Sequence, residues 1–281
     1  MGDLPEAVVR EIVARALAED IGPGDITTAA TVDPGTPCRA EIVAKAEGVV
    51  AGVGVAEATF HAVDPDISFE YAVHDGQRVA PGTVVARLSG DAAAILTAER
   101  TALNFLQRVS GIATLTAQYV AAVEGTPARI IDTRKTAPGL RGLDKYAVRA
   151  GGGANHRMGL FDGILIKDNH IQAAGGLGEA VERAREAAHH LVKVEVETQD
   201  LAQVEGALSA GADVIMLDNM GVEEIRRAVE LIGERAETEV SGGVTLETVR
   251  ELAECGVDYI SVGALTHSAP ALDLSLEIGD A

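Results

Sequence analysis

The sequence predicts an α/β protein with an N-terminal α+β sandwich domain followed by an incomplete parallel α/β barrel of six or seven strands. Three observations lead to this fold class. The chain has 281 residues, 47% of them hydrophobic, which is enough for two modest cores. Up to residue 128, strand-like and helix-like patterns follow one another without a regular alternation. From Arg129 onward, short β-branched runs alternate with helical stretches, as they do in parallel α/β folds.

In the N-terminal part, apolar residues at roughly helical spacing predict a helix over 4–18, with Pro5 at an early helical position. Extended patterns predict strands at 39–46, 67–73 and 83–88, and a helix is expected at 52–63. Two longer helices are expected at 92–109 and 112–123, because Ser110 and Gly111 interrupt an otherwise helical pattern.

The C-terminal part contains six strand-then-helix units. The predicted strands are 129–132, 163–167, 192–197, 214–217, 238–240 and 259–262, and the helices between them include 180–189, 201–210, 222–231 and 246–254. Because no GxGxxG nucleotide fingerprint accompanies them, these units favour a TIM-like barrel short of eight strands. A flat, doubly wound sheet is the alternative that the pattern leaves open.

Composition argues against several classes of protein and site. The net charge of −20 repels nucleic acid and anionic membranes, so neither is expected as a partner. The chain shows no signal-peptide pattern and no apolar stretch long enough to span a membrane, which favours a cytoplasmic location. Cys38 and Cys255 are isolated and lack the spacing of zinc or redox sites, which also fits a reducing compartment.

Cations are concentrated in one segment of this acidic chain. Between Arg129 and His170 there are eight Lys or Arg residues and four Asp residues, a local net charge of +4. Two apolar runs in this segment end at charged residues, the first at Asp132 and the second at Lys167. Cationic groups at the ends of buried strands favour carboxylate or phosphate ligands, so the segment predicts an anion site. Solvated helix faces remain the alternative explanation for any single one of these charges.

Polar or glycine residues follow each predicted strand, and in a barrel these residues would converge at one mouth. In chain order they are 132–135 (DTRK), 167–170 (KDNH), Glu195 and Glu197, Asp218 and Asn219, Ser241 to Gly243, and Gly263 with Ala264. Caps and turns are the alternative explanation for Asn219 and Ser241. The SGG and VGA turns are candidates for binding phosphate through backbone amides.

In the strand with the sequence KVEVE, Lys193, Glu195 and Glu197 share one face because side chains alternate along a strand. Glu197 lies nearest the carboxyl end and is therefore the predicted site residue. We expect Lys193 and Glu195 to be paired beneath it, and a buried ionic layer is the alternative role for both glutamates. His170 follows Asn169 and is expected to cap a helix.

Three motifs, DTRKTAPGLR, KYAVRAGGGANHR and LIKDNH, occur in fixed order over about forty residues, which makes them far more specific than a lone glycine fingerprint. Together with AERTALN at 98–104, an acidic EDIGPGD segment near the N-terminus and the final LTHSAPALDLSL, they resemble the quinolinate phosphoribosyltransferases, the decarboxylating enzymes of NAD synthesis. The resemblance covers nearly the whole chain, and no site motif is missing from it.

This resemblance implies that quinolinate and phosphoribosyl pyrophosphate (PRPP) give nicotinate mononucleotide, pyrophosphate and CO2, with Mg²⁺ and without an organic cofactor. The residues implied to bind the substrates are Arg100, Thr133, Arg134, Lys135, His156, Arg157, Lys167, Glu197, Asp218, Ser241, Gly242, Gly243 and Gly263. Four of them, Lys135, Lys167, Glu197 and Asp218, are expected to be catalytic. Of these, Glu197 and Asp218 are expected to hold magnesium, directly or through water.

The resemblance also implies at least a homodimer, in which Arg100 reaches the active site of the partner subunit. It further implies that the end of the chain returns to the first domain. We therefore expect an N-terminal domain over 1–111 that is rejoined by 268–281, and a catalytic barrel over 112–267.

Three other readings of the residues remain open. Lys167 at the end of a buried strand is also where a barrel aldolase would carry a Schiff-base lysine. A paralogue with another substrate would share the fold, because fold does not fix function. A nicotinate phosphoribosyltransferase fits less well, since a monocarboxylate would not need so many cations.

Overall fold

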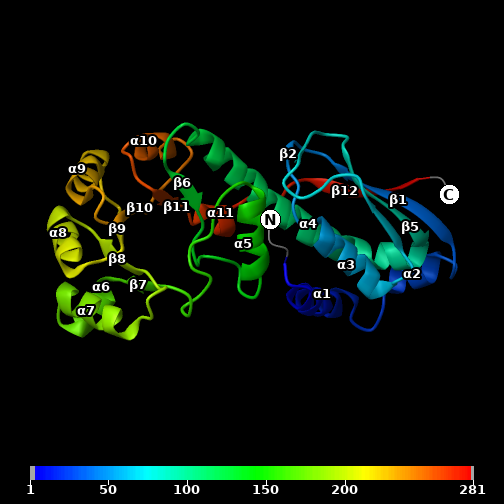
Figure 1. Ribbon diagram of the computed structural model, residues 1–281. Coiled ribbons are helices and arrows are strands. Elements are labelled where there is room, and N and C mark those ends of the chain that lie inside the picture. The colour runs from blue at the N-terminus through cyan, green and yellow to red at the C-terminus, as the bar shows by residue number, and fades with distance from the viewer. Residues whose placement is uncertain (1–3, 280–281) are drawn as a thin grey trace. The chain divides into compact units, whose positions relative to one another are not determined.

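The computed structural model describes residues 4–279, which form two compact units (Figure 1). Within the described residues, unit 1 comprises 4–117, 136–152 and 265–279, and unit 2 comprises 118–135 and 153–264. The chain is therefore an α/β protein in which an antiparallel sheet and a parallel sheet belong to different units. No helix in the described part of the chain is both long and apolar enough to cross a membrane.

Unit 1 is built on a four-stranded antiparallel sheet whose strand order is β12-β1-β5-β3. Its elements are α1 (Glu6–Ile21), α2 (Ile26–Thr31), β1 (Pro37–Ala44), β2 (Gly48–Val49), α3 (Val53–Val63), β3 (Ser68–Tyr71), β4 (Arg78–Val79), β5 (Val84–Asp91), α4 (Ala92–Ala122, which continues into unit 2), α5 (Arg141–Ala150), α11 (Ala264–His267) and β12 (Leu274–Gly279). The last strand of the chain pairs with the first, with Ile278 opposite Ala40.

The core of unit 1 lies between this sheet and the helices α3 and α4. Its largest fully buried side chains include Ile42 from β1, Phe60 from α3, and Ile95, Leu103 and Leu106 from α4. Burying a side chain of this size contributes about 1.5–3 kcal/mol, so this cluster is a main source of the unit's stability.

The prediction of two helices broken at Ser110 and Gly111 was wrong, because α4 runs unbroken from Ala92 to Ala122. Both residues serve tertiary packing. The Ser110 hydroxyl bonds the backbone of Ala51, with its Oγ 3.0 Å from the amide nitrogen. A Cβ on Gly111 would lie 2.1 Å from the carbonyl oxygen of Pro270, so only glycine allows this close approach. The expected domain boundary after residue 111 thus falls inside a helix.

Unit 2 is a six-stranded parallel sheet with strand order β6-β11-β10-β9-β8-β7. Its elements after α4 are β6 (Arg129–Ile131), β7 (Ile164–Ile166), α6 (Asp168–Ala174), α7 (Leu177–Ala187), β8 (Val194–Thr198), α8 (Leu201–Ala210), β9 (Val214–Asp218), α9 (Val222–Ile232), β10 (Glu237–Ser241), α10 (Val249–Ala253) and β11 (Tyr259–Ser261). Helices α7 to α10 follow one another along the outside of the strands (Figure 1).

This strand order is that of an opened barrel. From β7 to β11 each strand lies beside the next one in sequence, and β6 lies beside β11. A doubly wound sheet would instead reverse direction at a central switch point, and no reversal occurs here. Within the described residues β6 and β7 are the two edge strands and do not pair with each other, so the barrel is incomplete, as predicted. Ala154 forms an isolated parallel bridge with Ile131 on the open side of β6.

The sequence analysis gave no range for four short helices: α2, α5, α6 and α11. Asp25 caps α2 by accepting hydrogen bonds from the amides of Thr27 and Thr28, at 3.1 and 3.0 Å. In α5, Asp144 and Lys145 are fully buried. Because charged residues also occur on its buried face, the helical spacing of apolar residues cannot be recognised in the sequence. His170 caps α6 as expected, since its Nδ1 accepts a hydrogen bond from the Lys167 amide at 2.9 Å.

Candidate active site

The carboxyl ends of all six strands of unit 2 surround one cavity of about 510 Å³. Its lining residues are Thr133, Arg134, Lys135, His156, Arg157, Leu165, Lys167, Glu197, Met216, Asp218, Asn219, Glu239, Ser241, Gly242, Gly243 and Ser261. Parallel α/β barrels keep their sites at this end, because the loops that follow the strands meet there. The cavity is therefore the candidate active site.

The cavity brings together all but two of the residues that the sequence analysis put forward. Arg100 lies in unit 1 and is exposed on α4, and Gly263 follows β11 without lining the cavity. Sequence reasoning missed four lining residues, namely Leu165, Met216, Glu239 and Ser261, and it named Asn219 as a strand-end residue without giving it a role in binding. Glu239 had a visible signal, because ETEVS in β10 repeats the alternation of KVEVE in β8.

The cation-rich segment is divided between the two units. Four of its eight cations, Arg134, Lys135, Arg157 and Lys167, line the cavity of unit 2. Three others, Arg141, Lys145 and Arg149, lie on α5 in unit 1. The expectation of an anion site thus rests on half of the cluster.

Lys167 and Glu197 form an ion pair at the mouth of the barrel. The Lys167 side chain projects from the end of β7, and the Glu197 side chain from the neighbouring strand β8. The pair places a fixed cation and a fixed anion next to each other in the cavity wall.

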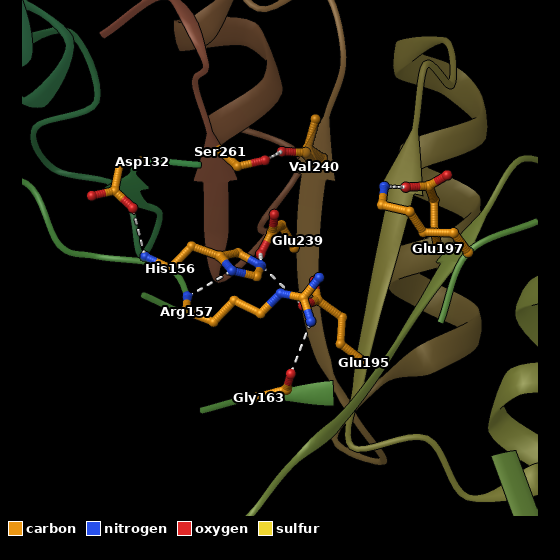
Figure 2. A network of polar contacts seen from close by, with 10 residues as sticks. Asp132, His156, Arg157, Gly163, Glu195, Glu197, Glu239, Val240 and Ser261 are labelled. Atoms are coloured by element: carbon orange, nitrogen blue, oxygen red, sulfur yellow. Dashed lines mark hydrogen bonds and ion pairs between the residues drawn. The ribbon is translucent and has the colours of Figure 1, made fainter. Parts of the chain in front are cut away.

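Asp132 holds the segment that carries His156. Its carboxylate is fully buried at the end of β6 and accepts a hydrogen bond from the Asn155 side chain at 2.6 Å. It accepts another from the His156 amide at 2.9 Å (Figure 2). A buried carboxylate must be paired to be tolerated, so Asp132 and the 155–156 backbone stabilise each other.

Both ring nitrogens of His156 have partners within unit 2. Nδ1 accepts a hydrogen bond from the Arg157 amide at 2.7 Å, and Nε2 lies 3.0 Å from a carboxylate oxygen of Glu195. Because Nδ1 accepts, the proton of the ring belongs on Nε2, which donates it to Glu195. This arrangement fixes the tautomer and the orientation of the imidazole.

Glu195 and Glu239 form a buried acidic pair around His156 (Figure 2). The His156 Nε2 atom lies 3.7 Å from Glu239, and each glutamate retains one buried oxygen without a hydrogen-bond partner. Burial, and the negative charge of Glu195 beside it, raise the pKa of Glu239 well above its ordinary value.

The expected pairing of Lys193 with Glu195 was wrong. Lys193 pairs with Glu237 at the opposite end of the barrel interior, at 2.6 Å, while Glu195 pairs with His156. Alternation places both Lys193 and Glu195 inward, but the stagger of neighbouring strands decides which inward side chains meet. Three polar layers result: Lys193 with Glu237, then His156 with Glu195 and Glu239, then Lys167 with Glu197 at the mouth.

Arg157 extends beside this middle layer. One guanidinium nitrogen donates to the Gly163 carbonyl at 2.9 Å, and its Nε is buried without a hydrogen-bond partner. Burial and the nearby Arg134 lower the pKa of Arg157, but an arginine starts so high that it remains a cation. A half-buried, incompletely bonded cation in a cavity wall is suited to an anionic ligand.

The Ser241 to Gly243 turn closes the cavity on the β10 side. Gly242 and Gly243 have φ of 94° and 62°, conformations that favour glycine. A Cβ on Gly242 would lie 2.2 Å from Oδ1 of Asn219, which is itself held at a φ of 56°. Neither glycine amide donates a backbone hydrogen bond within the described residues, so both are available to an anion.

Two carboxylates in the wall have the donor chemistry for a hard cation. Glu197 and Asp218 both line the cavity, Glu197 is engaged by Lys167, and Asp218 accepts a hydrogen bond from Asn219 at 2.8 Å. Carboxylate oxygens are the ligands that Mg²⁺ prefers, together with water and substrate phosphates.

Comparison with known proteins agrees with this geometry. Residues 25–110 match the model of the N-terminal domain of quinolinate phosphoribosyl transferase, and residues 112–277 match that of its C-terminal domain. The chain belongs to the quinolinate phosphoribosyltransferase family.

Individual relatives extend over almost the entire chain. A Bacillus subtilis protein named probable nicotinate-nucleotide pyrophosphorylase (carboxylating) is 46% identical, covering 96% of this chain and 93% of the relative. A Nicotiana glauca protein named quinolinate phosphoribosyltransferase (decarboxylating) 2, mitochondrial, is 47% identical over 98% of this chain and 83% of its own. The crystal structure of NadC from Streptococcus pyogenes superimposes with a TM-score of 0.95 at 42% identity over the full length of both chains.

Proposed function

We propose that this member of the quinolinate phosphoribosyltransferase family transfers phosphoribose from PRPP to quinolinate and releases pyrophosphate and CO2, giving nicotinate mononucleotide for NAD synthesis. The observation that carries the proposal is one cavity in which four cations, two carboxylates and a glycine turn meet at the strand ends. The two isolated, buried cysteines and the acidic surface fit a cytoplasmic enzyme.

Quinolinate is a flat dianion, and the cavity offers it fixed cations. Arg134 and Arg157 supply planar donor forks that match carboxylates, whereas Lys135 and Lys167 supply point charges. His156 positions this wall through its neighbour Arg157 and contributes its ring face to the cavity. The ring nitrogen of quinolinate already carries a lone pair, so no general base is needed for its attack.

Attack on the anomeric carbon of PRPP develops positive charge on the ribose as pyrophosphate departs. The carboxylates of Glu197 and Asp218 stabilise that charge and hold the ribose hydroxyls. They are also the residues that would hold magnesium, directly or through water, and the bound cation would neutralise charge on the pyrophosphate. Lys167 keeps Glu197 in place through their ion pair.

The glycine turn is assigned to the phosphate of PRPP. The amides of Gly242 and Gly243, with the Ser241 hydroxyl and Thr133, which follows β6, form a polar cradle for an anion. Gly263 is assigned a supporting role, because it follows β11 next to Ser261, which does line the cavity.

Decarboxylation follows from the first step. Once the ring nitrogen is bonded to ribose it is positively charged, and it stabilises the electron pair that the departing carboxylate leaves on the adjacent carbon. Desolvation in the cavity favours the loss of that carboxylate, so no organic cofactor is required.

A homodimer completes the proposal. Arg100 is exposed on α4. We assign it to the active site of the partner subunit, where it adds a further cation for quinolinate.

A Schiff-base role for Lys167 has less support. Such a lysine must have its amine free to attack a carbonyl, whereas the Lys167 side chain is engaged by the Glu197 carboxylate. Borohydride trapping with a carbonyl substrate would label Lys167 if that role were correct.

The direct test is a mass-spectrometric product assay of purified protein with Mg²⁺, PRPP and either quinolinate or nicotinate. We expect nicotinate mononucleotide and CO2 from quinolinate, and no product from nicotinate. Turnover of nicotinate alone, or of neither substrate by folded protein, would refute the proposal.

A further inference from the structure

The established members of this family decarboxylate their substrate, and that step needs a proton that none of the roles above supplies. When the carboxylate leaves the ring, its electron pair stays on the carbon beside the ring nitrogen. A hydrogen must then be bonded to that carbon in the product. The acid that delivers it has to be protonated at neutral pH and has to face the cavity.

Glu239 meets both conditions by its position. It lines the cavity and is 2% exposed, so its carboxyl group is at the cavity floor and almost without solvent. Its Oε1 atom is buried without a hydrogen-bond partner, and so is Oε1 of Glu195. Two adjacent buried carboxyl groups with unpaired oxygens are satisfied when one of them holds a proton and donates it to the other.

The surroundings assign the proton to Glu239. Glu195 accepts the hydrogen bond from His156 Nε2 at 3.0 Å, whereas Glu239 is 3.7 Å from the same atom and lacks such a donor. The remaining charged or polar groups facing Glu239 are Lys167 after β7 and Ser261 on β11; both favour its ionised form, but less strongly than burial and Glu195 oppose it. Arg157 lies on the Glu195 side and stabilises that carboxylate.

Glu239 also borders a second cavity. It lines a lower cavity of about 440 Å³ that continues to the amino ends of the strands, and only His156 and Arg157 share both cavities with it. At the lower end, the Lys193 and Glu237 side chains are 60% and 38% exposed. A group between a substrate cavity and a cavity that reaches solvent can deliver a proton on one side and be reloaded from the other.

We propose that Glu239 is kept as a carboxylic acid at the cavity floor and supplies the proton that replaces the departing carboxylate on the pyridine ring. The bond between the ring carbon and the carboxylate breaks and CO2 leaves in the same step in which the proton is transferred. The electron pair left on the ring carbon takes the proton from the Glu239 hydroxyl, directly or through one water, and Glu239 becomes a carboxylate. Water in the lower cavity then returns a proton to it.

A bound metal is the main competing explanation of the cluster, because His156, Glu195 and Glu239 each place one ligand atom within 4.8 Å of the others. The histidine argues against it. With Nδ1 accepting from the Arg157 amide, Nε2 carries a hydrogen and has no lone pair for a metal.

The test separates the two chemical steps in Glu239→Gln, which keeps the shape and hydrogen-bonding capacity of the side chain but removes the acid. In a rapid-quench experiment with quinolinate, PRPP and Mg²⁺, pyrophosphate release should stay near the wild-type rate. CO2 release should slow by about 100-fold or more, the lower bound for a positioned proton transfer, and the ribosylated dicarboxylate should accumulate. Glu237→Gln, the matched change on the same face of β10, should leave both rates near wild type.

A second measurement does not depend on the activity of a variant. Infrared difference spectra in H2O and D2O at neutral pH should show a protonated carboxylic acid in the wild type and in Glu237→Gln, but not in Glu239→Gln. In the wild type, the rate of CO2 release should fall as pH rises through the pKa of Glu239, while pyrophosphate release should not follow that transition.

The inference rests on the proposed function, and different outcomes would refute the proposed function and the role of Glu239. No pyrophosphate and no CO2 from the wild type would refute the proposed function. If the wild type turns over normally, three results would refute the role of Glu239 alone. The first is the absence of the infrared band of a carboxylic acid, and the second is a stoichiometric metal cation whose removal alone restores that band. The third is CO2 release in Glu239→Gln that keeps pace with pyrophosphate release. Equal loss of both steps in that variant would reduce Glu239 to a structural residue.

Discussion

At the scale of single residues, the polar layers inside the barrel separate charges that line the cavity from charges that do not. Lys167, after β7, and Glu197, in β8, face the cavity, whereas Lys193 and Glu237 lie at the amino ends of β8 and β10. Both pairs consist of a lysine and a glutamate. Their different depths therefore predict different consequences of the same substitution.

Replacing Lys167 by Met should lower turnover by about 100-fold or more, because it removes a fixed cation from the region where charge develops and leaves Glu197 unpaired. Lys193→Met is the matched control and should retain near-native turnover. Steady-state rates with both substrates saturating measure the difference. A Lys167→Met variant that is folded and as active as Lys193→Met would exclude Lys167 from catalysis.

Gly242→Ala should weaken PRPP binding more than quinolinate binding. Its Cβ would lie 2.2 Å from Asn219 Oδ1, and its φ of 94° already disfavours a side chain. Gly175→Ala, at a φ of 96° in open space, is the control for backbone strain alone. The KM for each substrate is the measurement, and equal effects of the two substitutions on KM for PRPP would argue against a phosphate site at this turn.

The protonation of Glu239 also predicts a pH dependence of stability. Its folded-state pKa is raised above the unfolded value, so the native state holds a proton that the unfolded state releases above about pH 4.3. Stability should therefore fall as pH rises above that value toward the folded pKa. Urea unfolding across this pH range should show the fall in the wild type and in Glu237→Gln, but a flatter profile in Glu239→Gln; parallel profiles would contradict an elevated pKa.

At the scale of elements, helix propensity favours alanine over glycine, whereas close packing can require glycine. Gly111 in α4 and Gly206 in α8 are both helical, and alanine is intrinsically better in a helix by about 1 kcal/mol. Their surroundings differ: a Cβ would lie 2.1 Å from a backbone oxygen at Gly111, but 3.8 Å from a leucine methyl group at Gly206.

Gly111→Ala should therefore destabilise the protein by about 1–3 kcal/mol, because the backbone around Pro270 must move to admit the methyl group. Gly206→Ala should be neutral or stabilising by up to about 1 kcal/mol. Urea midpoints at a constant m-value give both numbers. Stabilisation by Gly111→Ala would mean that the 270–271 backbone does not pack this closely on α4.

At the scale of the whole molecule, the question is whether one chain forms a complete site. If Arg100 serves the partner's site, Arg100→Ala and Lys167→Met inactivate different halves of each composite site. Homodimers of either variant should then be nearly inactive. Their mixture should regain about a quarter of wild-type activity after subunit exchange, because half of the dimers are mixed and each mixed dimer has one intact site.

The activity of mixtures over time, together with subunit mass by native mass spectrometry, checks this prediction. Two Lys167→Met preparations mixed in the same way are the control and should regain nothing. If Arg100→Ala alone retains full activity, or if the mixture stays inactive although subunits exchange, the partner's arginine has no place in the site.

Much of the fold and of the candidate site could be predicted from the sequence. Strand ends could be located because apolar runs stop at Asp132, Lys167 and Asp218, and the fold then brings such ends together. The unbroken α4 and the fully buried charges of α5 could not be predicted, because their surfaces are decided by residues distant in sequence. Glu239 was accessible in principle from the alternation in β10, but nothing local distinguished it from Glu237.

The sequence alone determined which residues face inward and which lie at strand ends, since a period of two and the end of an apolar run are local properties. Only the tertiary structure decided which inward residues meet. The stagger between strands joined Lys167 to Glu197, Lys193 to Glu237, and Glu195 to His156 and Glu239. Contact depends on distance in space, and burial at that contact sets the charge state, so pairing and protonation are properties of the fold.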